Sequence, residues 1–560
     1  MNKAGYRLLI LGATVFLLKT VCARNVHHLS FKQHEERLYK HEKRQGAQAA
    51  TFTFAKHFQS HMVLQREPAR ANIYGFSPNV GQTVNAQLVT PTRTYTYSTT
   101  VQKSSNATVG IWTVELDAQN ADTPANISVT SQGTTLTLTD LIFGDVWICS
   151  GQSNMQFPVN HMIDAADEKA DVNYPNIRIF TVRDRESNVT LDDLVDVGQA
   201  WTRPNSGVVG TFSAVCWVYG KNIHKALGHA IGLIHSSWGG TPAEAWSSPT
   251  ALAKCGNLDT RAHKRDDYKV PHSNEERVEQ LKVENQNNNT VLWNAMIYPL
   301  LKTSIKGAIW YQGESDADGI KQIHYNCTFP EMISDWRLNF HQASNGQTDP
   351  AFPFGFVQLA PYNNLPNQTR GFPDIRWHQT ADYGYVPNPK MPNTFMAVAI
   401  DLPDFNSTYG RIHPRYKKDV GDRLALSGLA IAYGRPEVYQ GPFPSKGAVV
   451  AGGFQITYNA SANLEIEIRN VTGFELLCNA RWTAANITSH DQVSVTLNNT
   501  CHPNESIKGL RYAWKESPCS FKACAVYGKV NGLPAPPFIL SVHSDAPGHS
   551  YMDFDAPVPR

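Results

Sequence analysis

The sequence predicts an α/β domain built on a parallel sheet, with a smaller β-rich domain before it and another after it. In the middle of the chain, apolar runs of strand length alternate with longer segments that can hold helices; the clearest runs are 146–149, 230–234, 308–310, 354–359 and 395–400. Runs that are apolar on both faces are typical of a parallel sheet covered by helices. On either side of this region the runs are short, alternating and rich in Thr, which indicates antiparallel strands.

Composition supports a folded chain of several domains. The chain has 560 residues, of which 41% are hydrophobic and 18% are charged. At roughly 150 residues per domain this length predicts about three or four domains, and the charge content is too low for a disordered chain. The formal net charge is only +2, so the sequence lacks the electrostatic signature of a nucleic-acid-binding protein.

The first 23 residues have the pattern of a signal peptide. Lys3 and Arg7 precede an apolar run from Leu8 to Leu18, and the small-residue site 21–23 follows it. This run is shorter than the roughly 20 apolar residues that span a bilayer, and no later run is long enough. We therefore expect a secreted or lysosomal protein without a membrane span. The polar segment 24–50 is expected to be a leader that is processed or flexible.

Cysteines and glycosylation motifs agree with export. Removal of Cys22 with the signal peptide leaves eight cysteines, an even number that is consistent with disulfides but allows about 105 pairings. The four late cysteines are the favoured paired set, whereas Cys149 and Cys216 lie in apolar runs and could be buried thiols. Twelve Asn-x-Ser/Thr motifs indicate a glycoprotein: Asn106, Asn126, Asn188, Asn288, Asn326, Asn367, Asn406, Asn459, Asn470, Asn486, Asn498 and Asn504.

The domains follow in order from these patterns. An N-terminal β domain is expected over 51–140, the α/β domain over 141–437, and a C-terminal β domain over 438–545, with a tail over 546–560. Four apolar runs of the middle domain end in small and polar residues, at 150–154, 236–241, 312–316 and 401–404. Loops beyond the carboxyl ends of parallel strands converge on the ligand site of an open α/β sheet, so these four loops are expected to form one site.

Ser153 and His413 are the candidate nucleophile and general base. Ser153 follows a predicted strand within Gly-Gln-Ser-Asn-Met, where a turn would expose its hydroxyl, although a capping serine is the common alternative. His413 precedes Pro414 and a helical pattern, which predicts a position near a helix N-cap, on a loop. Asp401 and Asp404 could orient its imidazole, as the acid does in a Ser-His-Asp triad.

Other polar residues of these loops have candidate roles in binding. Gly239, Gly240 and Gln312 are candidate oxyanion donors. Glu314 and Asp316 could suggest a glycosidase, but two carboxylates on one loop poorly match a pair that flanks a glycosidic bond. The chain has no His-Glu-x-x-His, Walker or Gly-x-Gly-x-x-Gly motif and no Gly-x-Ser-x-Gly elbow, so neither a metal nor another cofactor is expected.

Taken together, these segments resemble the sequence blocks of the sialate O-acetylesterase family, which belongs to the SGNH-type (GDSL-like) hydrolases. The blocks begin at Gly144, Ser236, Trp310 and Ile412, and they read GDVWICSGQSNM, SSWGGTPAEAW, WYQGESD and IHPR. The segment 375–399 and the motif APPF at 535–538 look like the animal members, and the resemblance runs from His61 onward.

The resemblance implies an activity and a set of roles. It implies hydrolysis of O-acetyl esters on sialic acids, chiefly at the 9-position, by a flavodoxin-like three-layer α/β domain between two β-rich domains. Ser153 would be the nucleophile and His413 the base, while Gln152, Glu314 and Asp316 would lie on the substrate side. The oxyanion donors would be the Ser153 N–H, a glycine of 239–240 and a group from 312–315. We expect kcat/KM to rise with pH as His413 becomes neutral.

The chain departs from the family pattern at two positions. Many SGNH enzymes have an Asp three residues before the His, where this chain has Gly410. The acid is therefore expected to be Asp401, with Asp404 second and a Ser-His dyad oriented by a backbone carbonyl third. The third block ends in Asp316, whereas the block of many animal relatives resembles Gly-Glu-Ser-Asn. A carboxylate that touched the substrate would disfavour an anionic sialic acid.

Two other functions fit the same residues. One is an acetylesterase for another acetylated sugar or polysaccharide, and the other is a catalytically silent protein that binds glycans through its β domains. The oligomeric state is not predicted by the sequence.

Overall fold

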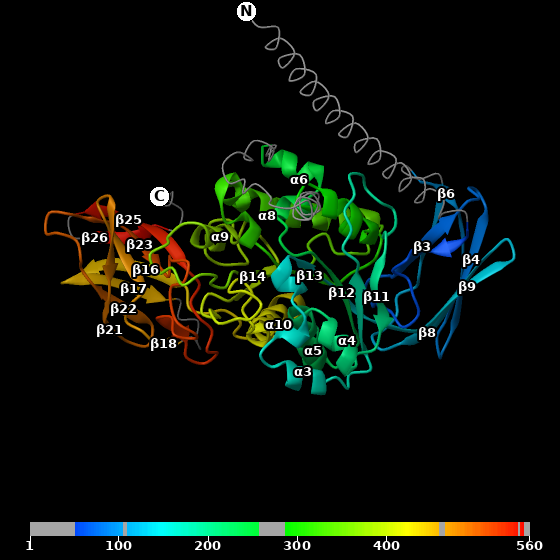
Figure 1. Ribbon diagram of the computed structural model, residues 1–560, viewed down its shortest axis with the longest axis horizontal. Coiled ribbons are helices and arrows are strands. Elements are labelled where there is room, and N and C mark those ends of the chain that lie inside the picture. The colour runs from blue at the N-terminus through cyan, green and yellow to red at the C-terminus, as the bar shows by residue number, and fades with distance from the viewer. Residues whose placement is uncertain (1–50, 105–108, 257–285, 459–464, 547–548, 554–560) are drawn as a thin grey trace, which may run out of the picture.

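The computed structural model describes residues 51–104, 109–256, 286–458, 465–546 and 549–553. Three parts lie in a row, with a β-rich N-terminal part at one end, a mixed α/β part in the middle and a β-rich C-terminal part at the other end (Figure 1). The predicted arrangement of an α/β domain between β-rich regions is thus confirmed. The predicted signal peptide and leader, and most of the predicted tail, lie outside the described residues.

The middle part is built on a sheet in the strand order β11-β10-β12-β9-β13-β14-β15. Its neighbouring strands are parallel except for β11, which pairs with β10 in the antiparallel sense. The strands are β9 (Thr134–Gly151), β10 (Ile177–Val182), β11 (Val197–Thr202), β12 (Ile231–Ser237), β13 (Gly307–Tyr311), β14 (Phe354–Gln358) and β15 (Thr394–Val398). Every residue of β12 to β15 is buried, which explains their continuous apolar sequences.

Helices cover both faces of this sheet (Figure 1). One face carries α5 (Ala214–Leu227) and α10 (Lys417–Tyr433), and the other carries α6 (Pro249–Lys254), α8 (Gly319–Ala343) and α9 (Phe372–His378). Shorter elements connect the strands: α2 (Ser153–Gln156), η1 (Val159–His161), α3 (Ala165–Ala170), α4 (Ser206–Thr211), η2 (Ala243–Trp246), η4 (Trp293–Ile297), η5 (Tyr298–Leu300) and η6 (Glu314–Asp316).

The N-terminal part shares a strand with the middle part. The first half of β9 pairs with β8 in the antiparallel sense, and its last residues pair with β12 and β13 in the parallel sense. The predicted boundary between residues 140 and 141 therefore falls inside one continuous strand. The other strands are β1 (Thr53–Phe54), β2 (Val63–Gln65), β3 (Asn72–Ser77), β4 (Thr83–Val89), β5 (Thr94–Thr100), β6 (Gln102–Lys103), β7 (Gly110–Glu115) and β8 (Pro124–Ser131).

The C-terminal part contains a nine-stranded sheet in the order β20-β19-β23-β25-β26-β16-β17-β22-β21, and a separate pair of β18 with β24. Its strands are β16 (Pro444–Val450), β17 (Gly453–Tyr458), β18 (Ile466–Ile468), β19 (Phe474–Cys478), β20 (Arg481–Ala485), β21 (Ile487–His490), β22 (Ser494–Asn498), β23 (Ile507–Tyr512), β24 (Val526–Gly528), β25 (Phe538–Ala546) and β26 (His549–Asp553). The alternation read in this part of the sequence belongs to these antiparallel strands.

All eight cysteines of the described chain form disulfides. The pairs are Cys149–Cys216, Cys255–Cys327, Cys478–Cys501 and Cys519–Cys524. Pairing among the four late cysteines is confirmed, but the alternative of buried thiols at Cys149 and Cys216 is wrong. Both residues are indeed buried, and they face each other because α5 packs against the sheet beside β9. Among the described residues, no helix is long and apolar enough to cross a membrane.

Strand order fixes where a site can form. From the central strand β9 the chain passes first to β10, β11 and β12 on one side, and then to β13, β14 and β15 on the other. The end of β9 lies directly beside the end of β13, with Gly151 opposite Tyr311. Loops that leave adjacent strands in opposite directions leave a crevice between them, which is the usual ligand site in open α/β sheets.

Candidate active site

Ser153 lies at this crevice, on a sharp turn between β9 and α2. Gly151 has a φ of +137°, and a Cβ added to it would come within 2.2 Å of the Tyr311 carbonyl oxygen. Only glycine fits both the conformation and this close approach. The next residue, Gln152, donates its N–H to the same carbonyl at 2.9 Å, so the turn is fixed to the end of β13. Ser153 then begins α2 and is partly exposed.

The Gln152 side chain points into the protein. It is 2% exposed, and its Oε1 accepts the Ser315 N–H at 3.2 Å and the Gly313 N–H at 3.5 Å. Gln152 therefore joins the loop after β9 to the loop after β13. The substrate contact of Gln152 that the sequence suggested stays a prediction.

Among the predicted oxyanion donors, the backbone N–H groups of Ser153 and Gly240 make no hydrogen bond within the described part of the chain. The Gly239 N–H, in contrast, donates to Gln156 Oε1 at 2.9 Å. A Cβ at Gly239 would lie 3.2 Å from the Ser153 Cβ, a tight contact beside the candidate nucleophile. Ser153 and Gly240 are thus the N–H groups available to an oxyanion.

Gln312 is fully occupied inside the protein. Its Nε2 donates to the Thr241 carbonyl at 3.2 Å and to the Asp316 carboxylate, and its Oε1 accepts the Tyr325 hydroxyl at 2.9 Å. Gln312 is completely buried. An oxyanion contact from Gln312 Nε2 would compete with the two hydrogen bonds that this atom already donates, so the structure does not support that role.

The imidazole of His413 is held through its Nδ1 by a backbone carbonyl. Its Nδ1 lies 2.7 Å from the Tyr409 carbonyl oxygen, which accepts only from a protonated nitrogen. The proton is therefore placed on Nδ1, and Nε2 is left with a lone pair. Burial lowers the pKa of His413, the Tyr409 hydrogen bond opposes this, and the Lys417 charge lowers it further.

The loops of Ser153 and His413 lie together, although the two side chains are not hydrogen-bonded within the described residues. The His413 ring is 6.3 Å from the ring of Phe157, which directly follows α2. Asn154, the residue after Ser153, donates to the Ile412 carbonyl at 2.9 Å. Apo enzymes often show long nucleophile–base distances that shorten when substrate binds.

The Pro-containing sequence predicted His413 near the N-cap of a helix, but the helix begins later in the chain. Helix α10 begins three residues after Pro414, at Lys417, with Tyr416 as its N-cap. The loop is braced by Asp404, which accepts from both the backbone N–H and the guanidinium of Arg415. His413 therefore lies on a braced loop ahead of the helix.

Neither candidate acid contacts His413. Asp401 is completely buried, and its carboxylate accepts two hydrogen bonds from Arg423, at 2.6 and 3.1 Å, and one from the Tyr527 hydroxyl at 3.0 Å. Asp404 binds Arg415. The only partner of His413 Nδ1 within the described chain is the Tyr409 carbonyl, so the structure favours the dyad that the sequence ranked third.

Asp316 is also buried inside the protein. It is 0% exposed, and its Oδ2 accepts from Gln312 and from the Ala243 N–H at 3.2 Å. Burial, the nearby charge of Glu244 and a hydrogen bond to Glu244 raise its pKa well above the usual range. A direct contact between Asp316 and a sialic acid carboxylate is therefore not supported.

Sequence reasoning missed two residues beside the candidate nucleophile and base, Asn154 and Lys417. Lys417 is completely buried, and its Nζ donates to Asn154 Oδ1 at 2.6 Å and to the Pro414 carbonyl at 2.7 Å. Asn154 Nδ2 also donates to Glu314 Oε1 at 2.5 Å. The only sequence signal was their position, one residue after Ser153 and four after His413.

Comparison with known proteins places this site in a family. The family described as "Carbohydrate esterase, sialic acid-specific acetylesterase" matches residues 143–425, and "Sialate O-acetylesterase C-terminal domain" matches residues 448–542. The first match contains Ser153, His413 and all the loops described above.

The chain belongs to the sialate O-acetylesterase family. It is 41% identical to the sialate O-acetylesterases of Mus musculus and Homo sapiens over 518 residues, which cover 88% and 89% of this chain and 94% of each relative. In overall structure it is similar to a carbohydrate acetylesterase from Xanthomonas citri, with a TM-score of 0.71 and 25% identity, over 87% of this chain and 99% of the other. Members of this family are carboxylic ester hydrolases.

Proposed function

We propose that this protein removes O-acetyl groups from sialic acids, chiefly at the 9-position, through an acetyl-enzyme on Ser153. The single observation that carries the proposal is the geometry at the crevice between the loops that leave β9 and β13. The family's serine lies on a glycine turn at the end of β9, and the loop of His413 is hydrogen-bonded to the residue that follows that serine. The matches cover 94% of the length of the mouse and human relatives, which are named sialate O-acetylesterases.

The reaction follows from the hydrogen bonds of this site. His413 Nε2 takes the proton of the Ser153 hydroxyl as Oγ attacks the acetyl carbonyl carbon, and the N–H groups of Ser153 and Gly240 bind the resulting oxyanion. When the C–O bond to the sugar breaks, His413 gives its proton to the leaving sugar oxygen. A water that is deprotonated by His413 then attacks the acetyl-serine, which releases acetate and restores the hydroxyl.

A Ser-His dyad replaces the triad in this proposal. Tyr409 fixes the imidazole with its carbonyl, in the position that a carboxylate would occupy in a triad. A neutral acceptor stabilises the imidazolium less than a carboxylate does, which keeps the pKa of His413 low. A base with a low pKa stays neutral in a mildly acidic compartment, in agreement with the proposed passage to a lysosome or to the cell exterior.

The fold agrees with a flavodoxin-like SGNH domain. If β9, β12, β13, β14 and β15 are numbered in chain order, their spatial order is 2-1-3-4-5, as in flavodoxin, and β10 and β11 extend one edge. Four disulfides favour an oxidising compartment, as expected for a protein of the secretory pathway.

The first experiment measures acetate release from 9-O-acetylated sialic acid by the wild type and by Ser153→Ala. We expect release by the wild type and a loss of at least about 10⁴-fold in the variant, because a residual rate without the nucleophile comes only from binding. Acetylated xylan is the control substrate for an esterase of another sugar.

The outcomes separate the candidate functions. Release that is faster from xylan than from sialate would contradict the proposed substrate but would keep the mechanism. Wild-type protein that binds sialylated glycans but releases no acetate from either ester would contradict the enzyme proposal and would favour the glycan-binding alternative.

A further inference from the structure

Both peptide carbonyls that flank His413 are held by side chains that meet beside the nucleophile. The Ile412 carbonyl accepts Asn154 Nδ2 at 2.9 Å, and the Pro414 carbonyl accepts Lys417 Nζ at 2.7 Å. Lys417 Nζ in turn donates to Asn154 Oδ1 at 2.6 Å. A short chain of hydrogen bonds therefore runs from the residue after Ser153 to both sides of His413.

We call the hydrogen-bonded pair Asn154 and Lys417 the bridge. Glu314 also binds this bridge. Glu314 Oε1 accepts the second N–H of Asn154, while Oε2 is buried without a hydrogen-bond partner in the described part of the chain. Burial raises the pKa of Glu314, while its hydrogen bond from Asn154 and the charge of Lys417 oppose that rise. Asn154 thus uses three of its four hydrogen-bonding positions, one toward Glu314 of η6 and two toward the segment that carries Ile412 and Lys417.

Stability alone does not account for a lysine at this position. Lys417 is completely buried and is the first residue of α10, where the helix dipole disfavours a cation. Burial lowers its pKa to about 7, although Glu314 and Asp404 oppose the shift. The rings of Phe157 and Tyr311 lie 4.8 and 5.3 Å from Nζ, so an apolar side chain would find apolar neighbours.

We propose that Asn154 and Lys417 are positioning residues that keep His413 in line with Ser153, and that Glu314 is the countercharge of this bridge and makes no contact with the substrate. The inference rests on the proposed function, because it assigns roles around the same nucleophile and base. Its physical basis is that small displacements of a catalytic group are costly: an error of about 1 Å can lower a rate by roughly 10²-fold.

The charge of Lys417 also acts on His413 and supplies a pH signature. The groups that face Lys417 are Glu314 from η6, Asp404 from the loop after β15, and His413 from the loop before α10. His161 lies near His413, since it stacks on Tyr409 at 3.9 Å and packs against Phe157. The positive charge lowers the pKa of His413, so its removal raises that pKa and moves the acid limb of kcat/KM to higher pH.

The test compares Lys417→Met and Asn154→Ala, singly and together, with Lys418→Met as the matched control. Lys418 is the neighbouring lysine, is partly exposed and pairs with Asp422. We expect kcat on 9-O-acetylated sialic acid to fall about 10²-fold in each single variant, with KM within about 3-fold of the wild type. The double variant should lose no more than the larger single loss, because both changes break the same bridge.

Two further readouts exclude a merely structural role. The acid limb of kcat/KM should move to higher pH in Lys417→Met and stay in place in Lys418→Met. Glu314→Gln should leave KM unchanged, whereas a substrate ligand would raise it. Wild-type kcat in Lys417→Met, multiplicative losses in the double variant, or a raised KM in Glu314→Gln would each overturn the inference.

Phosphonylation of Ser153 by a fluorophosphonate separates this inference from the proposed function. The labelling rate reports how well His413 activates Ser153, whatever the natural substrate. If the wild type is labelled about 10²-fold faster than Lys417→Met but releases no acetate from sialate, the bridge stands and the proposed substrate fails. Equal labelling rates would overturn the bridge. If Lys417→Met does not fold, Lys417→Gln, which keeps a donor without the charge, takes its place in every measurement.

Discussion

Asp401 is a carboxylate at the end of a strand whose contacts connect distant parts of the fold. Its two oxygens are taken by Arg423 of α10 and by Tyr527 of the C-terminal part, and its own carbonyl accepts the Lys522 N–H. The residue therefore joins the middle part of the molecule to the C-terminal part. Buried ion pairs of this kind are costly to break from one side, because the remaining charge stays buried.

We predict that Asp401→Asn lowers stability far more than it lowers the turnover of the folded enzyme. The free energy of unfolding should fall by about 3 kcal/mol because Arg423 loses its countercharge. Over the same comparison kcat should change by less than about 10-fold, whereas loss of a triad acid costs about 10⁴-fold. Urea denaturation and initial rates measure both quantities. Asp422→Asn, at an exposed pair, is the control, and a large loss of kcat with unchanged stability would restore Asp401 as the triad acid.

At the scale of elements, the site is assembled where three loops are tied to one another. Gln152, after β9, accepts from the loop after β13, and Gln312, after β13, donates to the loop after β12. Asp316 of η6 accepts the Ala243 N–H at the start of η2. These bonds set the distance between the nucleophile turn and the two glycines of 239–240. The loops are consequently rigid supports for the site.

We predict that Asp316→Asn stabilises the protein at neutral pH and leaves KM for acetylated sialate unchanged. The pKa of Asp316 is raised in the folded protein, so its contribution is complete below the unfolded pKa of about 4 and is lost as pH rises toward the folded value. The asparagine variant has no such loss. Its Tm should therefore exceed that of the wild type at pH 7 and approach or fall below it at pH 4.

Thermal melts at several pH values, together with KM measurements, check this prediction. A variant with the same Tm difference at pH 4 and pH 7 would show that Asp316 does not titrate between them. A several-fold change in KM would instead show that residue 316 reaches the substrate. Both measurements are needed, because the pH dependence of Tm tests whether Asp316 is buried with a raised pKa, and KM tests whether it contacts the substrate.

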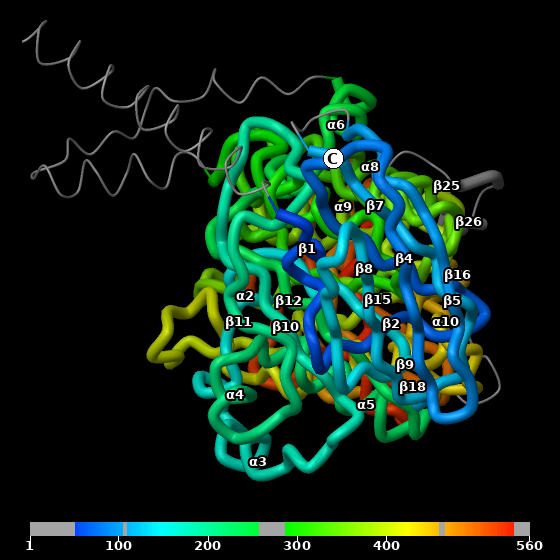
Figure 2. The backbone as a smooth tube through the Cα atoms, turned by 90° about the vertical axis from the view of Figure 1, so that its right-hand side faces the viewer, coloured from blue at the N-terminus to red at the C-terminus, as the bar shows by residue number. Residues whose placement is uncertain are grey.

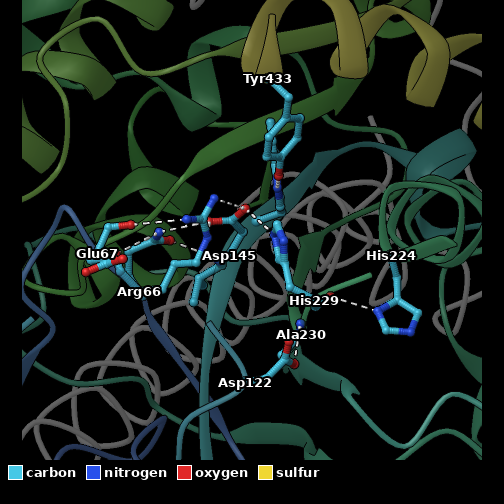
Figure 3. Close-up of polar contacts among 11 residues, drawn as sticks. Arg66, Glu67, Asp122, Asp145, His224, His229, Ala230 and Tyr433 are labelled. Atoms are coloured by element: carbon cyan, nitrogen blue, oxygen red, sulfur yellow. Dashed lines mark hydrogen bonds and ion pairs between the residues drawn. The ribbon is translucent and has the colours of Figure 1, made fainter. Parts of the chain in front are cut away.

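At the scale of the whole molecule, the N-terminal part is fixed to the central sheet by a buried polar cluster around Asp145 (Figure 3). The Asp145 carboxylate accepts from Arg66 at 3.0 and 3.3 Å, from Gln65 at 3.1 Å, and contacts His229 Nε2 at 2.8 Å. Viewed from the N-terminal side, the strands of that part cover the near end of the molecule (Figure 2). Asp145 lies at the opposite end of the parallel register from Gly151, far from Ser153.

We predict that Asp145→Asn destabilises the protein by about 3 kcal/mol at pH 7 without changing kcat/KM at temperatures where it is folded. Burial alone would raise the pKa of Asp145, but His229 and Arg66 outweigh it and lower the pKa to about 2. This stabilisation is present above the unfolded pKa of about 4 and is lost as pH falls toward 2. The difference between wild type and variant in urea denaturation should shrink over that range, and a difference independent of pH would contradict the prediction.

The sequence predicted a mixed α/β domain between β-rich regions and the turn that carries Ser153 at the end of a strand. Apolar runs of strand length without alternation are typical of strands buried on both faces, and a glycine before Gln152-Ser153 permits a turn that other residues cannot make. These are local properties, because they depend on the side chains of a short segment and on the conformations that the segment allows. The order of the four sequence blocks likewise carried the family resemblance without any knowledge of contacts.

Only the tertiary structure decided what the polar side chains do. Asp401, Asp316 and Gln312 were placed near the site by sequence, yet their partners, such as Arg423, come from segments distant in the chain. A carboxylate or amide binds whatever donor the fold brings within about 3 Å, and that distance depends on how strands and helices pack. The same reason explains why Lys417 was missed, since its importance lies in burial beside Asn154 and not in its type.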